Sequence, residues 1–96
     1  MVNAVIYYHQ NQDERFEQAV ENINKLIKQI ETQHVIKGVF LDSFNERNEL
    51  VELINSPLSE IDYLFLNKII EDEFDKQLIS ELSKTEDFEL IFFDLA

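Results

Sequence analysis

The sequence predicts an α/β domain, a three-layer sandwich in which a four-stranded, mainly parallel sheet lies between helices. Apolar runs that suit strands alternate with segments whose apolar residues recur every three or four positions. The first run, Val2–Asn11, is apolar or aromatic without interruption from Ala4 to Tyr8, which is typical of a central strand covered on both faces. Right-handed crossovers between alternating strands and helices then favour parallel strands, with helices on both sides of the sheet.

The first helix is predicted from about Asp13 to Gln33. Asn11 is expected to cap it, and Glu14 can reach back to the backbone N–H of Asn11. The apolar positions repeat at helical spacing and predict one continuous core-facing stripe. That stripe consists of Phe16, Ala19, Val20, Ile23, Leu26, Ile27 and Ile30.

His34 leads into the second strand, which is predicted from Val35 to Asp42 and carries Gly38, the single glycine of the chain. A lone glycine in a strand marks a bulge or a close backbone approach. Residues 43–46 are expected to form a loop, and a short helix follows from about Arg47 to Asn55. Pro57 stops that helix because proline cannot continue the hydrogen-bond ladder.

The third strand is predicted at Tyr63–Leu66, the third helix from about Asp72 to Leu82, and the fourth strand at Leu90–Phe93. The inward side chains of the third helix are predicted to be Phe74, Leu78, Ile79 and Leu82. The fourth strand is very hydrophobic and lies at the end of the chain, so it is expected to be an unprotected edge of the sheet. Such an edge can pair with a second copy, which makes a homodimer the expected assembly.

Length and composition restrict the function classes. Ninety-six residues, 1–96, are expected to form a single domain. No run approaches the roughly 20 apolar residues that span a bilayer, and no secretion signal is recognised, so a cytoplasmic protein without membrane contact is expected. The absence of cysteine excludes disulfides and thiolate chemistry. A net charge of −12 opposes autonomous binding to nucleic acid, whose affinity comes largely from cations that neutralise phosphates.

Histidine and glycine usage also argues against a metal or cofactor site. His9 and His34 are the two histidines, and a predicted helix separates them without ligand spacing. One glycine cannot build a glycine-rich phosphate loop. No metal and no cofactor are therefore expected. A small enzyme that uses His9 as a base is the least favoured alternative, because no nucleophile accompanies that histidine.

Four segments carry a resemblance that spans nearly the whole chain: AVIYYHQNQDER, VFLDSFNERNELVELI, IDYLFLNKIIEDEFDKQLISEL and LIFFD. In pattern and order they are similar to the catalytic domain of the serine site-specific recombinases, the resolvases and invertases. The resemblance implies a resolvase-like fold, with the strands in the order second, first, third, fourth.

The resemblance places the nucleophilic serine of that family at Asn11 and the arginine two residues before it at His9. An amide has no ionisable oxygen, so Asn11 is not expected to form a phosphoseryl link. The arginine-bearing turn of the family falls within residues 68–75, which hold no arginine. This stretch contributes an expected acidic surface made of Glu71, Asp72, Glu73 and Asp75.

Two positions keep the family's residue types. Asp42 matches the acidic residue at the end of the second strand, although a strand-end residue that hydrogen-bonds its own turn is the simpler interpretation. Arg47 matches the loop arginine. It is either a relic phosphate clamp or, as we favour, an arginine paired with Glu46 or Glu49.

These observations lead to the expectation that the chain is not an enzyme. The first hypothesis is a non-catalytic resolvase-like domain that acts through contacts with a protein partner, as a regulator within a phage or mobile element. The alternative is an acidic decoy that mimics the charge of DNA and occupies a basic nucleic-acid-binding protein.

Overall fold

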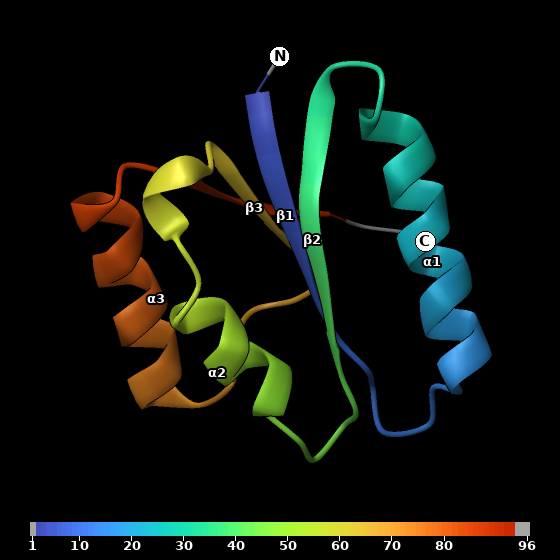
Figure 1. The fold of residues 1–96 in the computed structure, drawn as a ribbon. Helices are drawn as coiled ribbons and strands as arrows, with labels where there is room; N and C mark the ends of the chain where they lie inside the picture. The colour runs from blue at the N-terminus through green and yellow to red at the C-terminus, as the bar shows by residue number, and fades with distance from the viewer. Residues whose placement is uncertain (1, 94–96) are drawn as a thin grey trace.

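A computed structural model describes residues 2–93, and its centre is a sheet of four parallel strands (Figure 1). The strands are β1 (Val2–His9), β2 (His34–Asp42), β3 (Tyr63–Leu66) and β4 (Glu89–Phe92). Their order in the sheet is β2-β1-β3-β4, which confirms the predicted fold class and strand order. β2 and β4 are the two edges.

The helices cover both faces of the sheet, with α1 (Phe16–Ile30) on one side and α2 (Asn48–Ile54) and α3 (Glu73–Thr85) on the other (Figure 1). A short 3-10 helix, Leu58–Glu60, which was not predicted, precedes β3. Within residues 2–93, no helix has both the length and the apolar character required to cross a membrane.

β1 is the centre of both cores, because its side chains alternate between the two faces. Val5 and Tyr7 belong to the core under α2 and α3. Ala4 and Ile6 pack with α1, and Tyr8 lies further along the same face. All five are at most 5% exposed, which confirms a first strand covered on both sides.

The register between β1 and β2 shifts once, since Ala4 faces Ile36 whereas Val5 faces Gly38. Lys37 is therefore the extra residue of a β-bulge, beside the glycine at which a bulge was expected. A Cβ atom at Gly38 would lie 3.2 Å from Cε2 of Phe40, so a larger side chain there would press on that ring.

Several details of the helices differ from the sequence predictions. α1 ends at Ile30 and α3 at Thr85, where Gln33 and Leu82 were expected. α1 begins at Phe16 instead of Asp13, because Asn11 to Glu14 form a turn before the helix. The predicted contact within this turn is confirmed, since Glu14 Oε1 accepts from the Asn11 N–H at 3.1 Å. Phe16 itself is 60% exposed and lies outside the core. Phe74 is 73% exposed, so its predicted inward orientation is wrong, and Asp75 is buried on the inner face of α3 instead.

Candidate functional site

A cleft of about 250 Å³ opens where the first three strands end. Its walls come from the end of β1, from the loop between β2 and α2, and from the loop between β3 and α3. In open α/β sheets, ligands collect at this edge, beside the point where consecutive connections leave in opposite directions. The lining residues used below are Tyr7, His9, Phe44, Arg47, Lys68 and Asp75.

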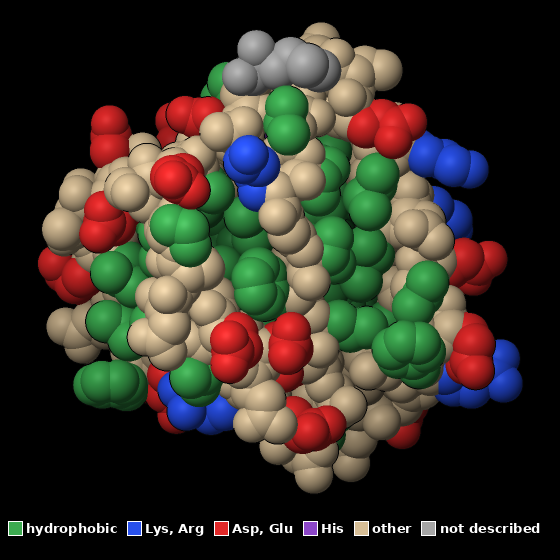
Figure 2. All heavy atoms as spheres, viewed as in Figure 1, with side chains coloured by type: hydrophobic (Ala, Val, Ile, Leu, Met, Phe, Trp, Pro, Cys, Tyr) green, Lys and Arg blue, Asp and Glu red, His purple; other side chains and the backbone are tan. Residues whose placement is uncertain are grey.

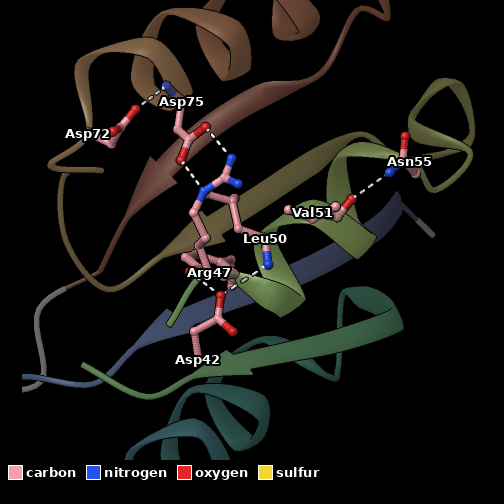
Figure 3. A network of polar contacts seen from close by, with 8 residues as sticks. Asp42, Arg47, Leu50, Val51, Asn55, Asp72 and Asp75 are labelled. Atoms are coloured by element: carbon pink, nitrogen blue, oxygen red, sulfur yellow. Dashed lines mark hydrogen bonds and ion pairs between the residues drawn. The ribbon is translucent and has the colours of Figure 1, made fainter. Parts of the chain in front are cut away.

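Asp42 lies beneath this cleft and organises it (Figure 3). Its carboxylate accepts hydrogen bonds from the backbone N–H groups of Glu49 and Leu50, at 2.9 and 3.0 Å, and from the hydroxyl of Tyr7 at 2.7 Å. The side chain thereby satisfies amides of the first turn of α2 that have no partner within the helix. Burial, with the hydrogen bond and negative charge of Asp42, raises the pKa of Tyr7.

Arg47 crosses the cleft from the start of α2 to Asp75 on α3 (Figure 3). Nε and Nη2 donate to the two carboxylate oxygens at 2.9 and 2.6 Å, which is the bidentate geometry of a strong ion pair. The Arg47 side chain is 56% exposed and that of Asp75 only 3%. The hydrogen bonds that Arg47 donates to Asp75, and then the negative charge of Asp75, raise the pKa of Arg47. The favoured pairing of Arg47 with Glu46 or Glu49 is therefore replaced by one with Asp75.

The expected acidic surface is only partly at the surface. Glu71, Asp72 and Glu73 are exposed, whereas Asp75 is buried and forms an ion pair with Arg47. Asp72 is the N-cap of α3, and its side chain accepts from the backbone N–H of Asp75 at 2.9 Å. Including Asp75 in a surface patch was wrong, because the residue lies on the core side of its helix.

His9 and Asn11 lie near each other but make different contacts. The His9 ring nitrogen Nε2 is 2.7 Å from the backbone carbonyl oxygen of Phe44. Asn67 holds the end of β1 against the end of β3, accepting from the His9 N–H at 2.8 Å and donating to the His9 carbonyl at 2.9 Å. Lys68 Nζ donates to Asn11 Oδ1 at 3.2 Å and is 3.4 Å from Glu71.

A second polar group lies at the same end of the sheet, on the α1 side. The Tyr8 hydroxyl donates to a carboxylate oxygen of Glu14, and the side chain of Asn22 donates to the Tyr8 oxygen at 3.0 Å. Burial, followed by the hydrogen bond to Glu14, raises the pKa of Tyr8 to about 12. This phenol therefore keeps its proton to a higher pH than an ordinary tyrosine does.

The residues that the resemblance singled out lie near one another, but only some of them line the cleft. His9 and Arg47 line the cleft, Asp42 lies beneath it, and Asn11 reaches its rim through Lys68. Tyr7 and Lys68 were not predicted to belong to the site. The role of Asp75 as the partner of Arg47 was not predicted either, although Asp75 precedes the core residue Ile79 by one helical turn, a signal that could have revealed its burial.

Chemically, the cleft offers imidazole, amide and carboxylate groups above an apolar floor. Both of its basic side chains, Arg47 and Lys68, already contact a carboxylate. Within residues 2–93, no three His, Asp or Glu side chains are grouped as a metal ion would require.

Comparison with known proteins identifies the fold. No protein-family model matches the chain, and no curated protein matches it. Among solved structures, the crystal structure of the C-terminal catalytic domain of ISC1926 TnpA, an IS607-like serine recombinase, matches with a TM-score of 0.75. The match covers 95% of this chain and 69% of the other, at 19% sequence identity. The chain thus has the fold of a serine-recombinase catalytic domain, as the sequence resemblance implied.

The same comparison corrects the expectation that the chain is not an enzyme. The structure that it matches is a catalytic domain. At 19% identity, the match identifies no residue of this chain as a lost active-site residue.

Proposed function

We propose that this chain is a serine-recombinase-like domain that acts by binding another protein, in the cytoplasm and in the setting of a phage or other mobile element. The shared fold supports the setting. The observation that carries the binding role is the apolar surface around the cleft, where Phe44 is 44% and Ile69 59% exposed. Bulky apolar side chains grouped at the surface and rimmed by polar residues are typical of protein interaction sites.

The state of the basic residues supports protein over nucleic acid as the partner. Arg47 is held by Asp75 in a bidentate pair, and Lys68 contacts Glu71 and Asn11. A phosphate would have to displace these carboxylates and would then face their negative charge. Since cations that neutralise phosphates supply most of the affinity for nucleic acid, the proposal includes no autonomous binding to DNA or RNA.

The experiment is co-purification of the tagged chain from its native host at about 0.1 M and about 1 M salt, which shortens the Debye length from about 10 to about 3 Å. A specific apolar interface is expected to retain one partner in near-equal amount at both salt concentrations. Recovery of no protein at either concentration would contradict the proposal, as would a stable complex with supercoiled DNA formed by the purified chain.

The second candidate is the acidic decoy, and the charge distribution favours it. The chain has 20 acidic and 8 basic residues. Acidic side chains are spread over the face of the molecule that Figure 2 shows, including its lower end. Glu71, Asp72 and Glu73, which follow β3, are exposed as well. For a decoy, we expect several basic nucleic-acid-binding proteins at low salt and none at high salt, because contacts between exposed charges are screened.

A further inference from the structure

The loop that follows β3 contributes an exposed apolar ridge to the cleft. Ile69 and Ile70 both line it, together with Phe44 of the loop after β2. The same two isoleucines also line a second groove, of about 250 Å³, beside α3 and β4. The apolar surface therefore continues past the cleft toward the edge of the sheet, as an extended contact with another chain requires.

The size of the cleft limits what it can hold. Pockets for drug-sized ligands occupy about 300–1,000 Å³. At about 250 Å³, this cleft lies below that range and suits one or two side chains. Its apolar floor, which includes Leu50, then favours an aliphatic or aromatic anchor over a polar one.

The charged residues around the cleft determine which charge a bound segment should carry beside its apolar side chain. Four carboxylates line it against two cations, and each cation is paired within the cleft: Arg47 with Asp75 and Lys68 with Glu71. Among residues 2–93, Glu46 and Asp72 make no ion pair. The charge available to an incoming segment is therefore negative.

We infer that the cleft between Phe44 and Ile69 binds a protein segment in which a bulky apolar side chain is flanked by lysine or arginine. The apolar side chain enters the cleft, and the flanking cations lie against Glu46 and Asp72. The inference rests on the proposed function and names the chemistry of its partner. A nucleic acid or a phosphorylated segment would bring negative charge to the same carboxylates and would be repelled.

The first test titrates the full chain with labelled synthetic peptides of equal length, by fluorescence anisotropy. One peptide carries a central leucine among lysines and arginines, a second has serine in place of leucine, and a third has glutamates in place of the cations. The first peptide should bind about tenfold more tightly than either control, because one control lacks the apolar side chain and the other lacks the cations that face the carboxylates. Equal binding of the three peptides, or no binding at about 1 mM, overturns the inference.

Matched variants locate the binding site. Ile69→Ser removes an exposed ridge side chain and should weaken binding about tenfold, whereas Val35→Ser alters a side chain that is 39% exposed at the opposite end of the sheet and should have no effect. Glu46→Gln with Asp72→Asn should weaken binding about threefold at low salt, and asparagine at position 72 can still cap α3. Glu17→Gln with Glu21→Gln is the control of equal charge, on the exposed side of α1.

Three outcomes separate this inference from the proposed function. If a partner co-purified from the host binds the Ile69→Ser and Glu46→Gln/Asp72→Asn chains as tightly as the wild type, the inference fails and the proposed function stands. If short DNA binds the cleft more tightly than the basic peptide, with the same sensitivity to Ile69→Ser, both fail. Loss of that partner in the cleft variants alone supports both.

Discussion

The hydroxyl of Tyr7 donates a hydrogen bond to Oδ2 of Asp42 at 2.7 Å inside the core, and the same carboxylate holds the first turn of α2. Asp42→Ala leaves two amides and one buried hydroxyl without their acceptor, and we expect it to lower the free energy of unfolding by about 3 kcal/mol. Tyr7→Phe should cost about 1 kcal/mol, because Asp42 keeps its other two donors. Urea unfolding followed by circular dichroism measures both.

The control for this comparison is Asp62→Ala. Asp62 accepts from the Asn3 N–H at 2.8 Å in an exposed contact at the other end of the sheet, and its loss should cost about 0.5 kcal/mol. A double-mutant cycle on Tyr7 and Asp42 should show a coupling of about 1 kcal/mol. Additive effects would show that the Tyr7–Asp42 hydrogen bond contributes nothing.

The ion pair between Arg47 and Asp75 is asymmetric, since the arginine is half exposed and the aspartate is buried. Arg47→Met strands a buried carboxylate, whereas Asp75→Asn leaves a guanidinium that water can solvate. We therefore expect Arg47→Met to be the more destabilising change, and Asp75→Asn to cost about 1 kcal/mol. Urea midpoints at neutral pH give the ranking.

The double variant Arg47→Met/Asp75→Leu is the internal check on this asymmetry. Replacing a buried pair with apolar groups is often neutral, so the double variant should recover most of the stability lost in Arg47→Met. A double variant no more stable than Arg47→Met would exclude the stranded carboxylate as the cause.

Tyr8 makes stability depend on pH in the alkaline range. Its pKa is raised from 10.0 to about 12 in the folded chain, so the folded state binds the phenolic proton more tightly than the unfolded state. The stabilisation is complete below pH 10 and is lost as the pH rises toward 12. Wild type should exceed Tyr8→Phe in stability at about pH 8, and the gap should narrow by about pH 11.

Urea titrations of both proteins at several pH values measure this gap. Asn22→Ala is the control variant, because it removes a hydrogen-bond donor to the Tyr8 oxygen and keeps the phenol. Its stability should therefore still fall between pH 10 and pH 12, as that of the wild type does. A gap between wild type and Tyr8→Phe that stays constant from neutral to alkaline pH would contradict the assignment.

β4 forms one edge of the sheet, and Phe92 on this strand is 52% exposed. Unpaired edges with exposed apolar side chains favour pairing with another chain, so we expect a concentration-dependent dimer in light scattering. Phe92→Lys should shift the mass toward the monomer. Val39→Lys, a similar change at the opposite edge, where Val39 is 41% exposed, should not. A monomeric wild type at high micromolar concentration would contradict the expectation.

Sequence patterns predicted the strands well. β3 begins and ends where it was expected, and β2 begins one residue earlier than expected. β1 and β4 agree within about two residues, because continuous apolar runs between polar loops define where a strand begins and ends. The bulge at Lys37 followed from the position of Gly38. Parallel order followed from the alternation of strands and helices together with the recombinase resemblance.

Helix starts and side-chain partners were harder to predict. Asn11 and Glu14 have the chemistry of a helix cap, but the structure uses them in a turn before α1. Phe74 was placed in the core for its hydrophobicity, whereas the helical period places Asp75 there beside Ile79. A buried aspartate becomes plausible only when its partner is known, and Arg47 lies 28 residues away in the sequence.

The carboxylate that holds the first turn of α2 also determines when that helix can form. α2 has only seven residues, too few to persist alone in water, and its amide partner is delivered by the end of β2. β2 is an edge strand, and β1 is the strand with which it pairs. We therefore expect α2 to form during folding only after β2 has paired with β1. In the native state, its amide protons should exchange with solvent together with those of the edge strand.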